Sequence, residues 1–315
     1  MILAAGLTPA WQQILVFDGL RLGQVNRARE AHQFASGKVL NVGLALHHLG
    51  ADSLTLAMIG GLAGKSIDEE FRRRGAPHRW ITSEKPTRIC TTVLDSANRV
   101  ITELVENAAQ ISPEEVEAFQ KAYAEIAGRA HYVVLSGSLP AGVPKVLYRD
   151  LIERTAGRVI LDASGQELAE ALPCRPLCVK PNRDELARTV GRPLHSEDDL
   201  KDAMIEVHRR GAQAVLVSHG ADPLWALCDG RLHVFRPPGI TAVNPIGSGD
   251  CLAAGLATAL SAGSDMVEAI RFGMAAAAEN AAMLLTSRLD PVRVRARMDQ
   301  VVCKALPYEA LPKTE

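Results

Sequence analysis

The sequence predicts an α/β protein built on a mostly parallel sheet with helices on both faces. Short apolar runs typical of buried strands alternate along the chain with segments of helical periodicity, and several of those segments end at a glycine, as helices often do. Parallel strands need crossover connections, so this alternation indicates a parallel sheet. The chain has 315 residues, of which 47% are apolar, and can bury a large core.

Six apolar runs are predicted to be buried strands: Ile2 to Ala5, Leu54 to Ile59, Tyr132 to Leu135, Val159 to Leu161, Leu177 to Val179 and Ala214 to Val217. Five segments are predicted to be helices: Leu40 to Leu49, Ile67 to Arg74, Pro113 to Ala127, Pro144 to Arg154 and Glu197 to Arg210. Ligands of such sheets bind at the carboxyl ends of the strands. We therefore look for function in the loops that follow the strands.

Two regions depart from the alternation. Residues from about 14 to 34, and the pair 89–94 and 100–105, are expected to form antiparallel strands or hairpins. Contributed from about 11–35 and 87–106, these strands would make a small lid over the site. Because no repeat, low-complexity tract or linker marks a second unit, we expect residues 1–315 to form a single domain.

Composition and charge favour a small-molecule partner. The net charge of −1 and a pI near 6.8 give no field that would hold nucleic acid or an anionic membrane surface. We find no signal peptide and no run of about 18 apolar residues, and six cysteines lie scattered without paired spacing. Reduced thiols in a cytoplasmic protein are expected. Pro173 and Pro176 would interrupt any helix that aligned Cys174 with Cys178, which argues against a metal role there.

The most informative segment runs from Asn244 to Asp250 and leads directly into an Ala-rich apolar run, Cys251 to Ala262. Small residues that open a helix expose backbone N–H groups and the positive end of the helix dipole, which together attract a phosphate-like anion. Asp250, in the first turn, is placed to take a proton from a hydroxyl held against that anion site. The simpler interpretation is a glycine bend with an aspartate that complements the dipole.

Another glycine-rich segment, Gly60 to Ser66, imitates a P-loop. The P-loop pattern needs a glycine where this chain has Ile59, so a plain turn is predicted instead. Protein-kinase signatures and the H-E-x-x-H zinc motif are also absent from the sequence.

Three further segments follow strands or open helices. In Pro181 to Leu186, Asn182 and Glu185 have the spacing of a capping box, but an amide and a carboxylate at a strand end are also ligands for Mg²⁺, and the two roles can coexist. Ser136 to Pro140 brings hydroxyls to another strand end, unless it is only a tight turn. Lys38, in the segment Ser36 to Asn41, opens a helix where it would meet a phosphate or simply be solvated.

With these pieces in order, the chain resembles the ribokinase-like carbohydrate kinases of the phosphofructokinase B family, and within it the 1-phosphofructokinase and tagatose-6-phosphate kinase branch. The similarity runs almost end to end. Its segments are Leu7 to Ala10, Gly23 to Arg27, Ser36 to Asn41, Thr87-Arg88, Ser136 to Pro140, Lys180 to Leu186, Ser218 to Gly220 and Asn244 to Asp250. The resemblance implies a three-layer α/β/α sandwich with a mostly parallel central sheet and a small β lid.

The resemblance also implies roles. Asp250 would deprotonate the sugar hydroxyl, and the N–H groups of Gly247, Ser248 and Gly249 would hold the γ-phosphate of ATP in transit. Asn182 and Glu185 would hold Mg²⁺. The ATP side would comprise Lys180, Asn182, Ser218, Gly220 and Asn280, and the substrate side Gln12, Lys38, Asn41, Arg88 and Ser138. Exposed lid strands would allow two copies of the chain to pair as a homodimer.

Departures from the family pattern fall mostly on the substrate side. Gln12 stands where the family usually has Asp, Val39 where it usually has glycine, and Cys90 and Thr92 where it usually has Asn and Lys. The leading hypothesis is an ATP- and Mg²⁺-dependent kinase of a ketohexose phosphate, of the fructose 1-phosphate or tagatose 6-phosphate type. Two alternatives stay open: a kinase of an unphosphorylated sugar or nucleoside, and a non-catalytic sugar or nucleotide sensor on the same scaffold.

Overall fold

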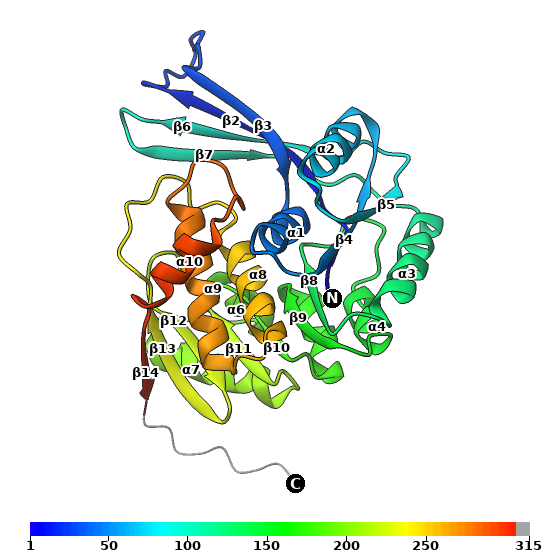
Figure 1. The fold of residues 1–315 in the computed structure, drawn as a ribbon, viewed down its shortest axis with the longest axis vertical. Helices are drawn as coiled ribbons and strands as arrows, with labels where there is room; N and C mark the ends of the chain where they lie inside the picture. Colours follow the sequence, from blue (N-terminus) through cyan, green and yellow to red (C-terminus); the bar gives the residue numbers. More distant parts are fainter. Residues whose placement is uncertain (307–315) are drawn as a thin grey trace.

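A main sheet forms the centre of the computed structural model, which describes residues 1–306. Within these residues its ten strands lie in the order β14-β13-β12-β11-β10-β9-β8-β1-β4-β5 (Figure 1). Neighbouring strands from β11 to β5 are parallel, and β12, β13 and β14 extend one edge as antiparallel neighbours. The strands are β1 (Ile2–Gly6), β4 (Ser53–Ile59), β5 (His78–Thr82), β8 (Tyr132–Ser136), β9 (Arg158–Asp162), β10 (Cys178–Val179), β11 (Ala214–Val217), β12 (Leu224–Cys228), β13 (Arg231–Arg236) and β14 (Val302–Leu306).

Helices cover both faces of this sheet. The residues described contain ten α-helices: α1 (Lys38–His48), α2 (Gly61–Arg74), α3 (Pro113–Ala127), α4 (Leu147–Glu153), α5 (Gly165–Ala171), α6 (Arg183–Val190), α7 (Glu197–Arg209), α8 (Ser248–Ser261), α9 (Met266–Ala281) and α10 (Pro291–Met298). The expected layered architecture with a mostly parallel sheet is confirmed.

Alternation along the buried strands divides the core into two layers. In β1, Ile2 and Ala4 pack with α1, α8, α9 and α10, whereas Leu3 and Ala5 pack with α3 to α7 on the opposite face. The α8–α9 pair packs closely because both helices carry glycine at the crossing: a Cβ on Gly255 would lie 2.8 Å from Gly273 Cα. This packing fixes the position of α8, whose N-terminus faces the candidate site.

A second sheet forms the lid, in the order β3-β2-β6-β7. Its strands are β2 (Ala10–Phe17), β3 (Glu30–Ser36), β6 (Ile89–Asp95) and β7 (Val100–Val105), and they project from the top of the molecule in Figure 1. The lid strands therefore come from the two regions expected. One pairing differs from the expectation: β2 and β6 run parallel, because the chain crosses the main sheet between them.

All six predicted strands and all five predicted helices are present; β11 and α3 have the predicted ends, and each of the others is shifted at one end or both. Helix α4 begins at Leu147 rather than Pro144. The plain turn predicted for Gly60 to Ser66 is wrong, because α2 begins at Gly61 and includes the rest of that segment. None of the helices described is long and apolar enough to cross a membrane.

Candidate active site

A cavity of about 260 Å³ lies at the carboxyl ends of β1, β8 and β9. Its wall brings together five side chains that are far apart in the sequence. Lys38 comes from the first turn of α1, Arg88 from the position just before β6, Ser138 from the loop after β8, Asp162 from the end of β9 and Glu185 from the first turn of α6. The cavity lies where ligands bind in parallel α/β sheets.

Helix α8 begins with an anion-binding geometry. Gly247 is its N-cap with φ of +79°, a conformation that favours glycine, and a Cβ there would lie 3.3 Å from Asn41 Nδ2. The N–H of Ser248 donates to the carbonyl of Pro245 at 3.1 Å. Among the residues described, the N–H groups of Gly247 and Gly249 have no hydrogen-bond partner. Two of the three amides predicted to bind phosphate are therefore unused in the fold.

Asp250 is buried behind this turn, with 5% of its surface exposed. Burial, together with the nearby carboxylate of Asp162, raises the pKa of Asp250 to about 7, while Lys38, a hydrogen bond from Asn41 and Lys180 act in the opposite direction. A carboxylate with a pKa near neutrality is suited to accept and release a proton at physiological pH.

Lys38 and Lys180 flank the buried carboxylate of Asp162. Lys38 Nζ lies 3.1 Å from Asp162 Oδ1 and 3.3 Å from Glu185 Oε1, and Lys180 Nζ lies 3.3 Å from Asp162 Oδ2. Burial alone would raise the pKa of Asp162, but the two ammonium groups hold it below its usual range. Burial would lower the pKa of Lys38, but the carboxylates of Asp162, Glu185 and Asp250 raise it. Of this cluster, Lys38, Asp162 and Glu185 line the cavity, so its wall is charged.

The Lys180 ammonium also lies beside the start of α8. Its Nζ is 3.3 Å from the position that a Cβ on Gly249 would occupy. A cation is thus held next to the unused amide of Gly249, and both favour an anion at this point.

Asn182 and Glu185 form the capping box that their spacing predicts. Asn182 Oδ1 accepts the N–H of Glu185, and Glu185 Oε2 accepts the N–H of Asn182, each at 2.8 Å. The other carboxylate oxygen of Glu185, Oε1, is directed to Lys38 at the cavity. Ser218 lies beside Asn182 through a β-bridge at the end of β11, and Gly220 follows with φ of +56° in open space. The ATP-side candidates after β10 and β11 are therefore adjacent.

Asn280 is fully buried behind the loop that precedes α8. Its Nδ2 donates to Ile246 O at 2.8 Å and to Ser248 Oγ at 3.1 Å, and its Oδ1 accepts the N–H of Ser287 at 2.7 Å. These contacts support the loop. Asn280 is therefore a structural support of the loop that carries the anion site.

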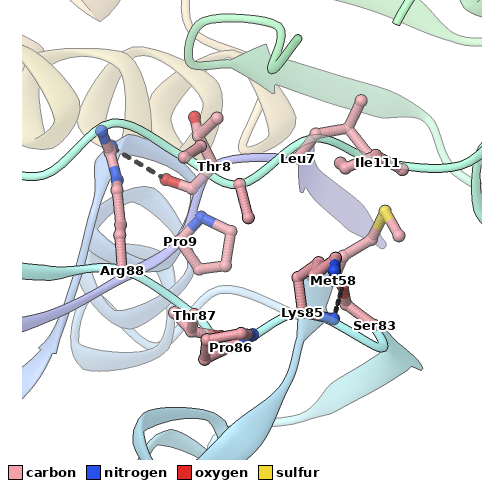
Figure 2. Close-up of a pocket in the computed structure, with 12 residues that line it drawn as sticks. Leu7, Thr8, Pro9, Met58, Ser83, Lys85, Pro86, Thr87, Arg88 and Ile111 are labelled. Carbon is pink, nitrogen blue, oxygen red and sulfur yellow. Dashed lines mark hydrogen bonds between the residues drawn. The ribbon is translucent and has the colours of Figure 1, made fainter. Parts of the chain in front are cut away.

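The substrate-side candidates divide into two groups. Lys38, Arg88 and Ser138 line the cavity, whereas Gln12 and Asn41 are not among its lining residues. Figure 2 shows Arg88 extended toward the carbonyl of Thr8, with NH2 at 3.3 Å from that oxygen. Arg88 also borders a second, smaller cavity of about 30 Å³, drawn in Figure 2. Its buried Nε has no hydrogen-bond partner among the residues described.

Sequence reasoning missed three charged residues of the cavity: Asp162, Glu167 and Arg188. Asp162 ends a correctly predicted strand, and a polar residue at a strand's carboxyl end is a signal that would have found it. Arg188 follows Glu185 by one helical turn, so the i, i+3 spacing on α6 places both on the same face. In the described part of the chain, Arg188 has no ion pair or hydrogen bond.

Comparisons with known proteins identify the family and the fold of this chain. The model of the pfkB family of carbohydrate kinases matches residues 10–288. Phosphofructokinase-2 from Escherichia coli in complex with potassium is 25% identical, with a TM-score of 0.87 over 95% of this chain and 99% of that one. The tetrameric inhibited form of that enzyme is 26% identical, with a TM-score of 0.85 over 95% and 99%. A possible 1-phosphofructokinase from Thermotoga maritima shares the fold at 22% identity, with a TM-score of 0.89 over 98% and 100%.

Proposed function

The chain belongs to the pfkB family of carbohydrate kinases, and from that premise we propose that it transfers the γ-phosphate of ATP to a hydroxyl of a ketohexose phosphate. The family establishes a phosphotransferase with ATP as donor and a sugar hydroxyl as acceptor. The observation that carries the transfer step is the position of Asp250, a buried carboxylate beside unused helix N–H groups and within one charged network with the cavity. The choice of a phosphorylated acceptor rests on Arg88 in the cavity wall. The family also disfavours the sensor alternative.

Asp250 acts as the general base. Its carboxylate takes the proton of the acceptor hydroxyl, the hydroxyl oxygen forms a bond to the γ-phosphorus, and the bond to the β,γ-bridging oxygen breaks to release ADP. A pKa near 7 leaves a substantial fraction of Asp250 ionised at neutral pH.

The start of α8 supplies charge stabilisation for the same step. The N–H groups of Gly247 and Gly249 are aimed at the oxygens of the transferring phosphoryl group, and Lys180 adds a positive charge beside them. Phosphoryl transfer needs positioning and neutralisation of charge more than covalent chemistry, so these fixed donors suit it.

The residues at the carboxyl end of β10 fit a divalent cation in part. Mg²⁺ in kinases is bound by one or two carboxylates together with water and substrate phosphates, and Glu185 Oε1 faces the cavity. Asn182 Oδ1 is already used in the capping box, so Asn182 would act through water or by holding Glu185. When bound, Mg²⁺ would neutralise charge on the nucleotide phosphates.

Arg88 is the main candidate for recognising a phosphate already on the acceptor. Its guanidinium lines the cavity and donates to backbone carbonyls at 3.3 and 3.4 Å, and within residues 1–306 no carboxylate pairs with its charge. Lys38 is instead paired with Asp162 and Glu185. An arginine free for bidentate bonding favours a sugar phosphate over a free sugar or nucleoside.

We also propose a homodimer through the lid. Strand β7 is an edge strand, and its exposed side chains include Leu104 and Val105, each 58% exposed. An exposed apolar edge is a surface for strand pairing or association. A second copy of the chain is the partner we expect. Light scattering on the purified protein would show a dimer, and Leu104→Lys would give a monomer.

A sugar panel with ATP and Mg²⁺ tests the proposed function. The enzyme should release ADP faster with fructose 1-phosphate or tagatose 6-phosphate as acceptor than with fructose, tagatose or a nucleoside. Asp250→Asn should lower turnover by roughly 10²- to 10⁴-fold, as for loss of a positioned base, while nucleotide binding by calorimetry stays within a few-fold. Near-normal turnover in that variant, or ADP release only with unphosphorylated acceptors, would contradict the proposal.

A further inference from the structure

Each carboxylate in the wall of the cavity of about 260 Å³ is paired with a lysine. The N–O distances lie between 2.6 and 3.3 Å, in the pairs Lys38–Asp162, Lys38–Glu185, Lys180–Asp162 and Lys145–Glu167. Three carboxylates and three lysines leave this network without net charge. The two arginines of the same wall, Arg88 and Arg188, have no carboxylate partner within residues 1–306. The cavity therefore has an excess of positive charge, which favours an anionic ligand.

Arg188 reaches this cavity from α6. It follows Glu185 by three residues, so both side chains leave the same face of the helix. Arg188 is exposed, and its guanidinium makes neither a hydrogen bond nor an ion pair with any residue that the structure describes. Arg88 instead precedes lid strand β6 and lines the cavity together with Thr8 and Ser138. The two cations thus come from different parts of the fold, since β6 belongs to the lid and α6 to the body of the molecule (Figure 1).

The position of Arg188 favours the nucleotide over the acceptor. Glu185 Oε1 is the carboxylate oxygen that would hold a divalent cation, and nucleotide phosphates bound to that cation would lie next to the face of α6 that carries Arg188. In-line phosphoryl transfer places the acceptor and the leaving group on opposite sides of the phosphorus. An acceptor phosphate at Arg88 therefore leaves the α6 side of the cavity for the phosphates of the nucleotide.

We propose that Arg188 binds the phosphate chain of the nucleotide beyond its α-phosphate, and that it is a specificity residue for nucleoside di- and triphosphates. This inference rests on the proposed function, because that function supplies the nucleotide. A guanidinium can donate two parallel hydrogen bonds to phosphate oxygens, and it stays charged at every pH at which the enzyme would work. Among the residues described, no contact of the Arg188 guanidinium has to break before it binds a phosphate.

Calorimetry with nucleotides alone tests this contact without turnover. Arg188→Ala should raise the Kd for ADP roughly 10- to 100-fold, as for loss of a charge-assisted contact, while the Kd for AMP, measured by displacement, stays within about 3-fold. Arg188→Lys keeps the charge without the two parallel bonds and should give an intermediate Kd for ADP. Arg192→Ala, which removes an arginine that pairs with Glu206 just beyond α6, is the matched control. An unchanged Kd for ADP in Arg188→Ala, or an equal loss of affinity for AMP, would overturn the proposal.

Steady-state kinetics separate the two ends of the cavity. In Arg188→Ala the KM for ATP should rise by a factor similar to the rise in the Kd for ADP, with the KM for the sugar phosphate within about 3-fold. A rise confined to the KM for the sugar phosphate would make Arg188 an acceptor ligand and overturn the proposal. Urea unfolding of Arg188→Ala should match the wild type, because the residue is exposed. Wild-type protein that binds ADP but phosphorylates no acceptor would instead contradict the proposed function and leave calorimetry as the test of Arg188.

Discussion

Gln12 Nε2 donates a hydrogen bond of 2.8 Å to Thr92 Oγ1, which joins lid strands β2 and β6 by their side chains. Gln12 is 5% exposed and Thr92 is fully buried. The same amide nitrogen lies 3.2 Å from the carbonyl of Gln13. Two of the four positions at which this chain departs from the usual family residues are thus partners, and together they form a neutral polar contact inside the lid.

Thr92→Val should destabilise the protein by about 1–3 kcal/mol, because it removes the shorter of the two hydrogen bonds of the buried Gln12 amide and leaves only the one to the carbonyl of Gln13. Adding Gln12→Leu removes both partners, so the double variant should be no less stable than Thr92→Val alone. Urea unfolding of the two single variants and the double variant measures the coupling. Thr102→Val, at an exposed position of β7, is the matched control. Strict additivity of the two changes would contradict the proposed pairing.

Arg88→Ala should weaken recognition of phosphorylated acceptors selectively. Charge-assisted bonds to phosphate contribute about 1.5–3 kcal/mol, so the KM for a sugar phosphate should rise on the order of 10- to 100-fold. The KM for the corresponding free sugar should hardly change. Arg72→Ala, which removes a 72% exposed arginine of α2, serves as control. An equal rise for both acceptors would show that Arg88 acts on the lid structure and not on the phosphate.

The rate should depend on pH through Asp250. The base works only when ionised, so kcat/KM should rise with pH with a midpoint near the pKa of about 7. Lys180 lowers that pKa, so Lys180→Met should shift the midpoint upward and reduce the rate at neutral pH. Steady-state kinetics between pH 5.5 and 8.5 on the wild type and this variant supply the test. A flat wild-type profile would exclude Asp250 as the titrating base.

Much of the fold follows from local sequence signals. The strands that end near the site are continuous apolar runs, and the capping box of Asn182 and Glu185 is encoded within four residues. The antiparallel strands β12 and β13 and the edge strand β14 were not among the predicted elements. Strand β14 pairs with β13 across some 70 residues, and such a pairing depends on tertiary structure more than on local pattern.

The local segments of the site could be predicted from the sequence, but the contacts between these segments could not. A glycine-rich loop before a helix indicates an anion site wherever it occurs, so Gly247 to Asp250 could be found from sequence. The pairing of Lys38 with Asp162 joins residues 124 positions apart, and the contact between Asn41 and Asp250 joins residues 209 apart. The hydrophobic periodicity of a sequence gives no information on contacts between residues so far apart in the chain. For this reason the sequence predicted that Lys38 would face a phosphate, but it did not predict the ion pairs of Lys38 with carboxylates.

Gly255→Ala should destabilise the crossing of α8 and α9. The new Cβ would lie 2.8 Å from Gly273 Cα and 3.1 Å from Ala276 Cβ, and overpacking of this kind costs about 1–3 kcal/mol. Alanine would otherwise favour the helix by about 1 kcal/mol. Gly128→Ala is the matched control, because its φ of −61° suits alanine and its nearest neighbour is 3.8 Å away. Equal thermal stability of the two variants would mean that the crossing has room for a methyl group.

Asp250→Asn should lose activity and gain stability, with a gain that depends on pH. The pKa of Asp250 is about 7 in the folded protein, above its ordinary value of 3.8, so the folded state binds more protons than the unfolded state between these values. The free energy of unfolding contributed by Asp250 therefore falls as pH rises from about 4 to 7. Asparagine does not titrate, so the variant should match the wild type near pH 4 and exceed it by on the order of 1–4 kcal/mol above pH 7. Denaturant unfolding at both pH values measures the difference.

Asp198→Asn, at a side chain 87% exposed, should show no such dependence. A variant that is less stable than the wild type at pH 8 would show that the ionised carboxylate is a net stabiliser of the fold, contrary to the burial that makes it a base.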